Sequence, residues 1–308
     1  MHERMFYTAR MRATYREEPC RTALNRVRGM PFEWSLNPYM GCAHRCSFCY
    51  VRAFEQRADR PSGSAYGSSI RVKVNIVEVL ARELARRSWR GAGVAIGAAT
   101  DPYQPAEGRY RLTRGCLESL AAAANPFAVI TRSPLIVRDL DLLARAARRA
   151  EVSVAFSVPC LDEDVWRATE PGTAPPRQRL RALRTLAQAG IRTSVAIAPI
   201  LPGISDRRDQ LTAVVEAARE AGACGIWSGV LHLRPGTREH FLESLAASWP
   251  ELVPRYEALY AARAYLPRAQ TAPLSATVAA LAHERGIGAS RARTLRPPPA
   301  PRQLSLEL

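Results

Sequence analysis

Short apolar runs alternate with longer amphipathic stretches through the middle of this 308-residue chain, and this alternation limits the fold more than any other feature. Most of the apolar runs are nearly continuous, as expected for parallel strands that are buried on both faces. The predicted strands are Phe32–Leu36, Gly93–Ala98, Phe127–Thr131, Val152–Val158, Thr193–Ile200 and Cys224–Leu233. The intervening stretches predict helices over residues 74–89, 113–124, 138–150, 176–190 and 208–222.

Repeated β-α units of this size predict a parallel sheet with right-handed crossovers. The six units are fewer than the eight of a closed TIM barrel. We therefore expect an α/β fold, a partial (β/α)6 TIM-like barrel that stays open. In such barrels the functional residues lie at the C-terminal ends of the strands and in the loops that follow them.

The chain is expected to divide into four parts. Residues 1–30 are polar and rich in arginine, and they predict an N-terminal extension that packs beside the first strand. The barrel should occupy residues 31–240, and a C-terminal helical segment residues 241–290, with helices near 238–265 and 274–285. Residues 291–308 include a run of prolines that cannot fold into a core, so we expect a disordered tail.

The net charge is +16, from 44 basic and 28 acidic residues, which favours nucleic acid as a partner. Only Lys73 is a lysine, however, and a chain rich in arginine and alanine is also typical of a GC-rich genome. The charge alone therefore does not identify a partner. No apolar run is long enough to cross a membrane, and the N-terminus lacks a secretory signal, so a cytoplasmic protein without a membrane partner is expected.

Three of the seven cysteines lie in the segment GCAHRCSFCY, after the first predicted strand. Cys42, Cys46 and Cys49 have the spacing C-x3-C-x2-C, and the odd total favours metal or redox chemistry over disulfides. A structural zinc site needs a fourth ligand. His44 could supply it, but it lies between two of the cysteines, and tight tetrahedral sites seldom use such a neighbour. An iron–sulfur cluster bound by three cysteines keeps one iron open to another ligand. We favour the cluster, with zinc or unligated thiols as the alternatives.

The motif, with the aromatic Phe48 before its last cysteine, resembles that of the radical S-adenosylmethionine (SAM) superfamily. Other segments narrow the resemblance to the branch related to spore photoproduct lyase, over residues 25–267. These segments are NPYMGCAHRCSFCY, GAATDPYQPAEGRYRLTRG, TRSPLIVRDLDLL, WRATEPGTAPPRQRL, APILPGISD and LHLRPGTRE.

The resemblance implies that Cys42, Cys46 and Cys49 bind a [4Fe–4S] cluster whose open iron chelates the amino and carboxylate groups of SAM. An electron from a donor of the flavodoxin or ferredoxin type would then cleave SAM. The resulting 5′-deoxyadenosyl radical would abstract a hydrogen atom from a substrate. Phe48 would contact the adenine.

The resemblance also assigns residues at the strand ends to the SAM site. These residues are Asp101, Arg132, Ser157, Pro199, His232 and Leu233. Alternatives remain for several of them. Asp101 is alternatively a turn residue, Ser157 a strand serine bonded to backbone, and His232 a packed histidine or, with Arg234, a substrate contact. Glu170 and Arg179 form either an ion pair flanking the site or a helix-surface pair.

The segment GAATDPY departs from the spore photoproduct lyases, which carry a further cysteine there that returns a hydrogen atom to the product radical. Ala98, Ala99 and Thr100 occupy the stretch, and Cys116 lies too far along the chain. We therefore do not predict cleavage of a thymine dimer. Tyr103 is either a radical relay or a packed turn tyrosine.

The chain ends in QLSLEL, which resembles the peptide that bacterial repair and replication factors insert into the DNA sliding clamp. The contacts would come from Gln303, Leu304, Leu306 and Leu308. A chance match, or a strand that docks on the parent domain, is the alternative.

Together these features predict a radical SAM enzyme with DNA or a nucleotide lesion as the favoured substrate. The alternatives are a radical enzyme that modifies a peptide or small metabolite, and a nucleic-acid-binding protein with a structural cluster.

Overall fold

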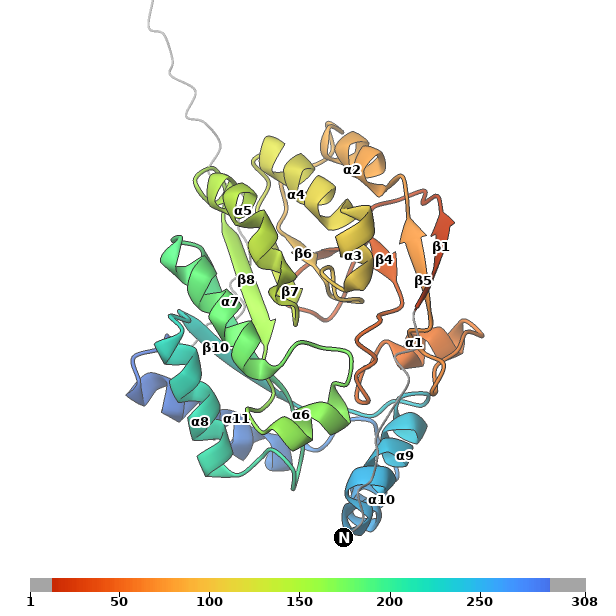
Figure 1. Cartoon of the computed structure of the whole chain (residues 1–308), viewed down its shortest axis with the longest axis vertical. Coiled ribbons are helices and arrows are strands. Elements are labelled where there is room, and N and C mark those ends of the chain that lie inside the picture. The colour runs from red at the N-terminus through yellow and green to blue at the C-terminus, as the bar shows by residue number, and fades with distance from the viewer. Residues whose placement is uncertain (1–12, 289–308) are drawn as a thin grey trace, which may run out of the picture.

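A computed structural model describes residues 13–288 of the chain, and its main sheet has seven strands in the order β10-β9-β8-β7-β6-β3-β2 (Figure 1). The six strands from β3 to β10 pair in parallel, and β2 pairs antiparallel with β3. The strands are β2 (Leu24–Arg26), β3 (Trp34–Leu36), β6 (Val94–Ile96), β7 (Phe127–Thr131), β8 (Val152–Ser157), β9 (Arg192–Ile200) and β10 (Gly225–Val230). Because β10 and β2 end the sheet without pairing to each other, the predicted open partial barrel is confirmed.

A second, three-stranded sheet was not predicted from the sequence. It has the order β1-β5-β4 and consists of β1 (Thr14–Glu18), β5 (Ser69–Lys73) and β4 (Tyr39–Met40). The N-terminal segment therefore supplies one strand to each sheet, β1 to the small sheet and β2 to the main one. β2 lies beside the first barrel strand, as expected.

The five helices predicted between the barrel strands are present, and they cover one face of the main sheet (Figure 1). They are α2 (Ile76–Leu84), α4 (Leu112–Ala122), α5 (Leu140–Ala147), α7 (Pro176–Gln188) and α8 (Arg208–Glu220). A 3₁₀ helix, η1 (Pro134–Asp139), precedes α5. Three short helices in the loops at the C-terminal ends of strands were not predicted: α1 (Arg52–Arg57), α3 (Pro105–Tyr110) and α6 (Glu163–Thr169).

The chain after the barrel is helical, as expected. It contains α9 (Arg238–Ser248), η2 (Pro250–Leu252), α10 (Val253–Leu259) and α11 (Arg268–Glu284). α9 crosses the predicted boundary at residue 240, and α11 begins before the predicted residue 274. α11 packs against β10 and α8, so it covers the edge of the main sheet.

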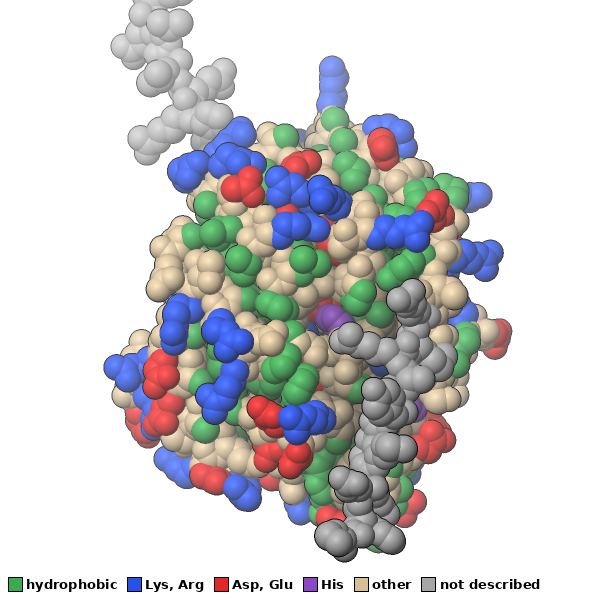
Figure 2. All heavy atoms as spheres, in the orientation of Figure 1, with side chains coloured by type: hydrophobic (Ala, Val, Ile, Leu, Met, Phe, Trp, Pro, Cys, Tyr) green, Lys and Arg blue, Asp and Glu red, His purple; other side chains and the backbone are tan. Residues whose placement is uncertain are grey.

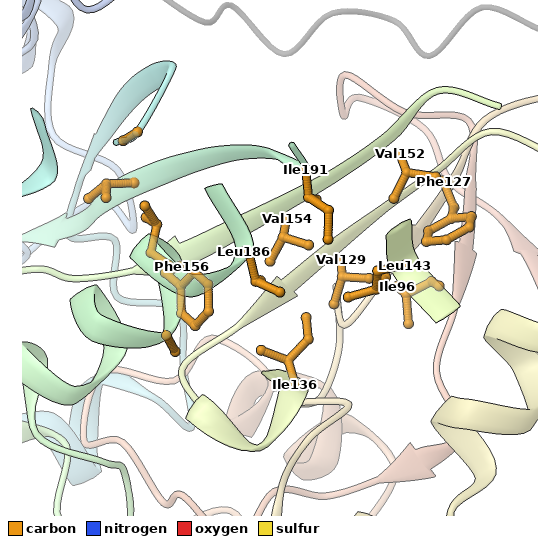
Figure 3. Close-up of a cluster of buried hydrophobic side chains, with 14 of the residues drawn as sticks. Ile96, Phe127, Val129, Ile136, Leu143, Val152, Val154, Phe156, Leu186 and Ile191 are labelled. Carbon is orange, nitrogen blue, oxygen red and sulfur yellow. The ribbon is translucent and has the colours of Figure 1, made fainter. Parts of the chain in front are cut away.

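Alternate residues of the central strands point toward the covering helices and form the main hydrophobic core (Figure 3). Val129, Val154, Phe156 and Ile197 belong to this set, and each is fully buried. Burial of one such side chain stabilises the fold by about 1.5–3 kcal/mol. Because these side chains point toward the helices, the opposite face of each strand lines the inside of the barrel.

The inner face of the barrel carries small side chains. Register places Ser35 beside Ala95, Ala95 beside Ala128, and Ala128 beside Ser153 across four neighbouring strands. Ala128 and Ser153 stay partly exposed although their strands lie in the middle of the sheet. Closed TIM barrels fill this space with bulky branched side chains. Small side chains line the inner face here; Ser35 and Ala95 are buried, and Ala128 and Ser153 are partly exposed.

No helix in residues 13–288 is both long enough and apolar enough to span a membrane. The predicted tail and its clamp-binding residues Gln303, Leu304, Leu306 and Leu308 lie outside the described residues.

Candidate active site

The three-cysteine loop lies at the C-terminal end of the barrel. The segment after β6 makes hydrogen bonds with the start of this loop, at Gly41 and Ala43. The Gly41 carbonyl accepts hydrogen bonds from the Thr100 hydroxyl (2.6 Å) and the Gln104 side-chain amide (3.0 Å). The Gln104 amide oxygen in turn accepts one from the Ala43 backbone N–H (3.0 Å). Gln104 is fully buried, so its amide is committed to the protein interior and holds the loop in place.

Arg52 holds the second half of the loop. It is buried, and its guanidinium donates to the carbonyl oxygens of Cys46 (3.3 Å), Arg45 (3.2 Å), Ser62 (2.7 Å) and Gly63 (2.6 Å). A buried cation is stable only where acceptors surround it, and the loop carbonyls supply them. This role was not predicted, because the four acceptors come from two separate loop segments.

Gly67 and Gly172 both pack closely against backbone atoms of the loop. A Cβ added at Gly67, whose φ is +75°, would lie 2.3 Å from the Cys42 carbonyl oxygen. A Cβ at Gly172 would lie 2.5 Å from the Ala43 carbonyl oxygen. Any larger residue would collide with backbone, so both positions require glycine.

The three thiols of the loop are free, and Cys42 and Cys46 are buried. The Cys49 Sγ lies 3.5 Å from the Tyr66 hydroxyl. Among the described residues, no three His, Cys, Asp or Glu side chains are grouped as ligands of one metal ion. A cubane cluster binds each thiolate through a different iron, so its ligands need not converge on one point. The loop therefore fits a [4Fe–4S] cluster better than a single zinc ion.

His44 interacts with an acidic residue rather than completing a zinc site. Its Nδ1 lies 3.3 Å from Asp101 Oδ2, and both side chains are buried. Burial alone would lower the pKa of His44, but Cys42 and Asp101 raise it to about 10. Burial also opposes ionisation of Cys42, yet the charge of His44 outweighs it and the pKa of this thiol is lowered. Thiolate is the form that binds iron, so His44 favours Cys42 as a ligand, whereas burial raises the pKa of the Cys46 and Cys49 thiols.

Asp101 joins the ends of β6 and β7. Its carboxylate accepts hydrogen bonds from the Thr131 hydroxyl (2.7 Å) and from the backbone N–H groups of Tyr103 (2.9 Å) and Arg132 (2.7 Å). Burial raises the pKa of Asp101, but His44 and these donors hold it below its ordinary value. The carboxylate is thus occupied within the protein, as in the turn interpretation.

Arg132, Glu170 and Arg179 form one ion-pair network, in which Glu170 and Arg179 are buried and Arg132 is partly exposed. The Arg132 Nε donates to Glu170 Oε1 at 2.6 Å, and the Arg179 guanidinium lies 3.1 Å from Glu170 Oε2. Arg179 also donates to the Ser157 carbonyl at 2.8 Å. The Glu170–Arg179 pair is therefore internal and not a helix-surface pair. Arg132 also lies over the Phe48 ring, with 5.6 Å between its Cζ and the ring centroid.

The remaining predicted SAM contacts lie at the same end of the barrel. Phe48 and Leu233 are buried in one apolar cluster with Cys46, and Pro199 lies near the end of β9. Ser157 ends β8 beside Ala196, and its hydroxyl makes no hydrogen bond with the described residues. His232 follows β10 and stacks on Tyr265. Their contacts with SAM remain predictions.

The segment GAATDPY, which departs from the spore photoproduct lyases, makes hydrogen bonds within the protein. The Ala98 carbonyl accepts a hydrogen bond from the Tyr50 hydroxyl, and the Ala99 N–H donates to the Asn37 side chain at 2.9 Å. Cys116 is fully buried on α4, within the main core. Tyr103 is buried and donates to Asp139 at 3.0 Å.

Comparison with known proteins identifies the family of this chain. The family described as the Radical SAM superfamily matches residues 36–215. An uncharacterized protein of Mycobacterium tuberculosis is 40% identical over 271 residues, covering 87% of this chain and 80% of that protein. The Radical SAM Nalpha-GlyT isomerase of Pseudomonas phage M6 is 29% identical over 174 residues, covering 56% of this chain and 34% of that protein.

Among solved structures, a spore photoproduct lyase variant with bound AdoMet and dinucleoside spore photoproduct has a similar fold. The TM-score is 0.67 at 18% identity, over 90% of this chain and 81% of that one. The similarity therefore extends beyond the barrel to most of the chain.

Proposed function

Because this chain belongs to the radical SAM superfamily, we propose that it is a radical SAM enzyme that acts on a modified or damaged nucleotide in nucleic acid. The superfamily uses a [4Fe–4S] cluster and SAM. When bound, they supply a 5′-deoxyadenosyl radical that abstracts a hydrogen atom from the substrate. The residues of this chain bind and orient these groups.

Cys42, Cys46 and Cys49 would bind the cluster. Arg52 and Gln104 fix the loop through its carbonyl and amide groups and so help to hold the thiols in place. Such supporting contacts commonly matter nearly as much as the ligands themselves.

Arg132 is the residue we expect to bind the carboxylate of SAM. Burial raises the pKa of the Cys46 thiol well above its ordinary value, and the positive charge of the nearby Arg132 offsets only part of this. Its Nε is held by Glu170, which fixes the direction of the guanidinium. A guanidinium binds a carboxylate through paired, charge-assisted hydrogen bonds.

The observation that carries the nucleotide proposal is the inner face of the barrel. Small side chains line it on neighbouring strands, and Trp227 on β10 adds a large aromatic side chain. Trp227 pairs with Ala196 in register and so shares the inner face, and it is 40% exposed. An exposed indole suits a flat ring that can stack on it.

Charge supports the same class of substrate. The net charge of +16 favours a polyanion. Figure 2 shows basic side chains spread over the face that carries α4, α5 and α7, with acidic side chains among them. The spore photoproduct lyase of similar fold binds a dinucleoside in its solved structure. A nucleotide is therefore compatible with a barrel of this size.

The test is anaerobic reconstitution of the full chain with iron and sulfide, followed by SAM and dithionite or a flavodoxin-type donor. We expect 5′-deoxyadenosine to form. Oligonucleotides with deuterated sugars or bases should then transfer deuterium to it. Absence of 5′-deoxyadenosine from a fully loaded cluster would contradict the enzyme assignment for this site. Deuterium transfer from peptides or small metabolites, and none from any oligonucleotide, would contradict the substrate class.

A further inference from the structure

Four aromatic side chains form a row that begins at the three-cysteine loop. The ring centroids of Phe54 and Tyr50 are 6.0 Å apart with an interplanar angle of 89°, and those of Tyr50 and His232 are 5.9 Å apart at 36°. His232 stacks on Tyr265, with centroids 4.8 Å apart and planes 10° apart. We refer to Phe54, Tyr50, His232 and Tyr265 as the aromatic row. It joins α1 to the segment between β10 and α9 and to the segment before α11.

Backbone contacts fix this row relative to the cluster loop. Tyr50 directly follows Cys49, whose carbonyl accepts a hydrogen bond from the Thr237 hydroxyl at 3.1 Å. The Leu233 N–H donates to the Ala264 carbonyl at 2.8 Å, which holds the residues beside His232 and Tyr265 together. The row is therefore anchored on both sides and does not depend on a single loop.

The two ends of the row reach the surface. Tyr265 is 53% exposed and Phe54 is 40% exposed. They are two of only five large hydrophobic residues that are exposed within the described residues, and the row connects them. An exposed, ordered aromatic row has hydrophobic surface that a ligand can cover, and such patches commonly mark binding sites.

An arginine lies over each exposed ring. The Cζ of Arg57 is 4.8 Å from the Phe54 centroid, and that of Arg234 is 5.6 Å from the Tyr265 centroid. Arg234 also donates to the Tyr265 hydroxyl at 3.1 Å. Within residues 13–288, neither guanidinium lies within 4.0 Å of a carboxylate oxygen. Their charges are therefore not neutralised by the acidic residues described.

We propose that the aromatic row, with Arg57 and Arg234, binds unpaired bases of a single-stranded nucleic acid beside the barrel opening. Bases of any sequence stack on exposed aromatic rings and on guanidinium planes that lie over them, and the positive charge of the arginines also attracts the phosphates that link the bases. A regular duplex would not fit, because its bases are already stacked on one another. This inference rests on the proposed function and deepens it, since it says how the strand next to the reacting nucleotide is held.

The test measures binding of the reconstituted full chain to a fluorescently labelled single-stranded oligonucleotide by anisotropy. Tyr265→Ala should weaken binding about tenfold, because one stacking surface is removed. Tyr265→Phe should bind like the unmodified protein, because the ring remains. Tyr110→Ala is the matched control, since Tyr110 also lies beside an arginine, Arg109, but outside the row. It should leave the affinity unchanged.

Salt dependence separates the arginines from the rings. In Arg57→Gln and Arg234→Gln, the slope of log affinity against log salt should fall by about 0.7 for each phosphate that is no longer bound. Tyr265→Ala should leave that slope unchanged. The proposal is overturned if Tyr265→Ala binds normally, or if the blunt duplex of the same sequence binds as tightly as the single strand and depends equally on Tyr265.

Failure of this binding surface and failure of the proposed function give different results. If an oligonucleotide transfers deuterium to 5′-deoxyadenosine but its binding does not depend on the row, only the binding proposal fails. If binding depends on the row but no oligonucleotide transfers deuterium, the substrate proposal fails and the binding surface stands.

Discussion

Gly172 and His44 are in direct backbone contact across the barrel mouth: the Gly172 N–H donates to the His44 carbonyl at 3.1 Å. A Cβ at Gly172 would lie 2.7 Å from that same oxygen. The segment after α6 therefore packs against the three-cysteine loop without any intervening side chain. The loop can pack this closely only because residue 172 has no side chain.

Gly172→Ala should displace the loop, because a carbonyl oxygen of the backbone cannot move aside as a flexible side chain can. We expect less iron per protein after anaerobic reconstitution and a decrease in unfolding free energy of about 1–3 kcal/mol. Iron analysis and urea unfolding measure the two effects. Gly108→Ala is the control, since a Cβ at Gly108 meets nothing within 4 Å. Equal iron content in both variants would contradict the contact.

Cys42→Ala, Cys46→Ala and Cys49→Ala should each abolish stable cluster binding, because each removes one of three protein ligands. The visible absorbance of the reconstituted protein and its iron and sulfide content are the measurements. Cys224→Ala should keep full loading, as Cys224 is exposed and lies at the start of β10, away from the loop. A loop variant that retains the complete cluster would rule out the ligand assignment at that position.

The parts of the molecule that depend on local pattern were predictable from the sequence. Val154 and Phe156 reveal their strand by alternating with smaller residues, and the spacing of the three loop cysteines is itself a local signal. The small sheet was missed because β1 is polar and pairs with β5 more than fifty residues away. Arg52 and Gly172 were missed for a related reason. Their roles depend on carbonyl groups of other segments, which no sequence pattern displays.

Glu170→Gln should strongly destabilise the protein, because Glu170 carries the negative charge between Arg132 and Arg179. The Arg179 side chain is 0% exposed and that of Glu170 is 1% exposed, so water cannot replace the missing charge. We expect a decrease of about 3 kcal/mol in unfolding free energy, measured by urea titration. The same substitution at Glu163 affects an exposed pair with Arg167 and should cost less than about 0.5 kcal/mol. Similar decreases in the two variants would mean that the buried network contributes little.

Removal of residues 303–308 should abolish binding to the bacterial DNA sliding clamp, the partner proposed from the segment QLSLEL. A pull-down with purified clamp compares the intact and shortened chains. Leu306→Ala with Leu308→Ala should give the same result, since these leucines are candidate anchors in the hydrophobic groove. Equal recovery of the clamp by the intact and shortened proteins would remove this partner from consideration.

Asp139 should make the stability of the protein depend on pH. Burial opposes its ionisation, but hydrogen bonds from Arg138 (2.9 Å), Arg114 (2.8 Å) and Tyr103 (3.0 Å) hold its pKa below the usual range. A carboxyl whose pKa is lowered in the folded state stabilises that state above its unfolded pKa of about 4. This contribution disappears as the pH falls through the folded pKa.

Asp139→Asn should therefore lower the urea midpoint clearly at pH 7, and the difference from the unmodified protein should shrink as the pH falls below about 4. Both proteins carry the same cysteine loop, so loss of the cluster in acid affects them equally and cancels in the difference. Asp164→Asn provides the control, because Asp164 pairs with Arg167 on the surface and should change the midpoint little at either pH. A difference for Asp139→Asn that stayed constant from about pH 7 to about pH 3 would indicate that the residue acts through its shape and packing rather than through its charge.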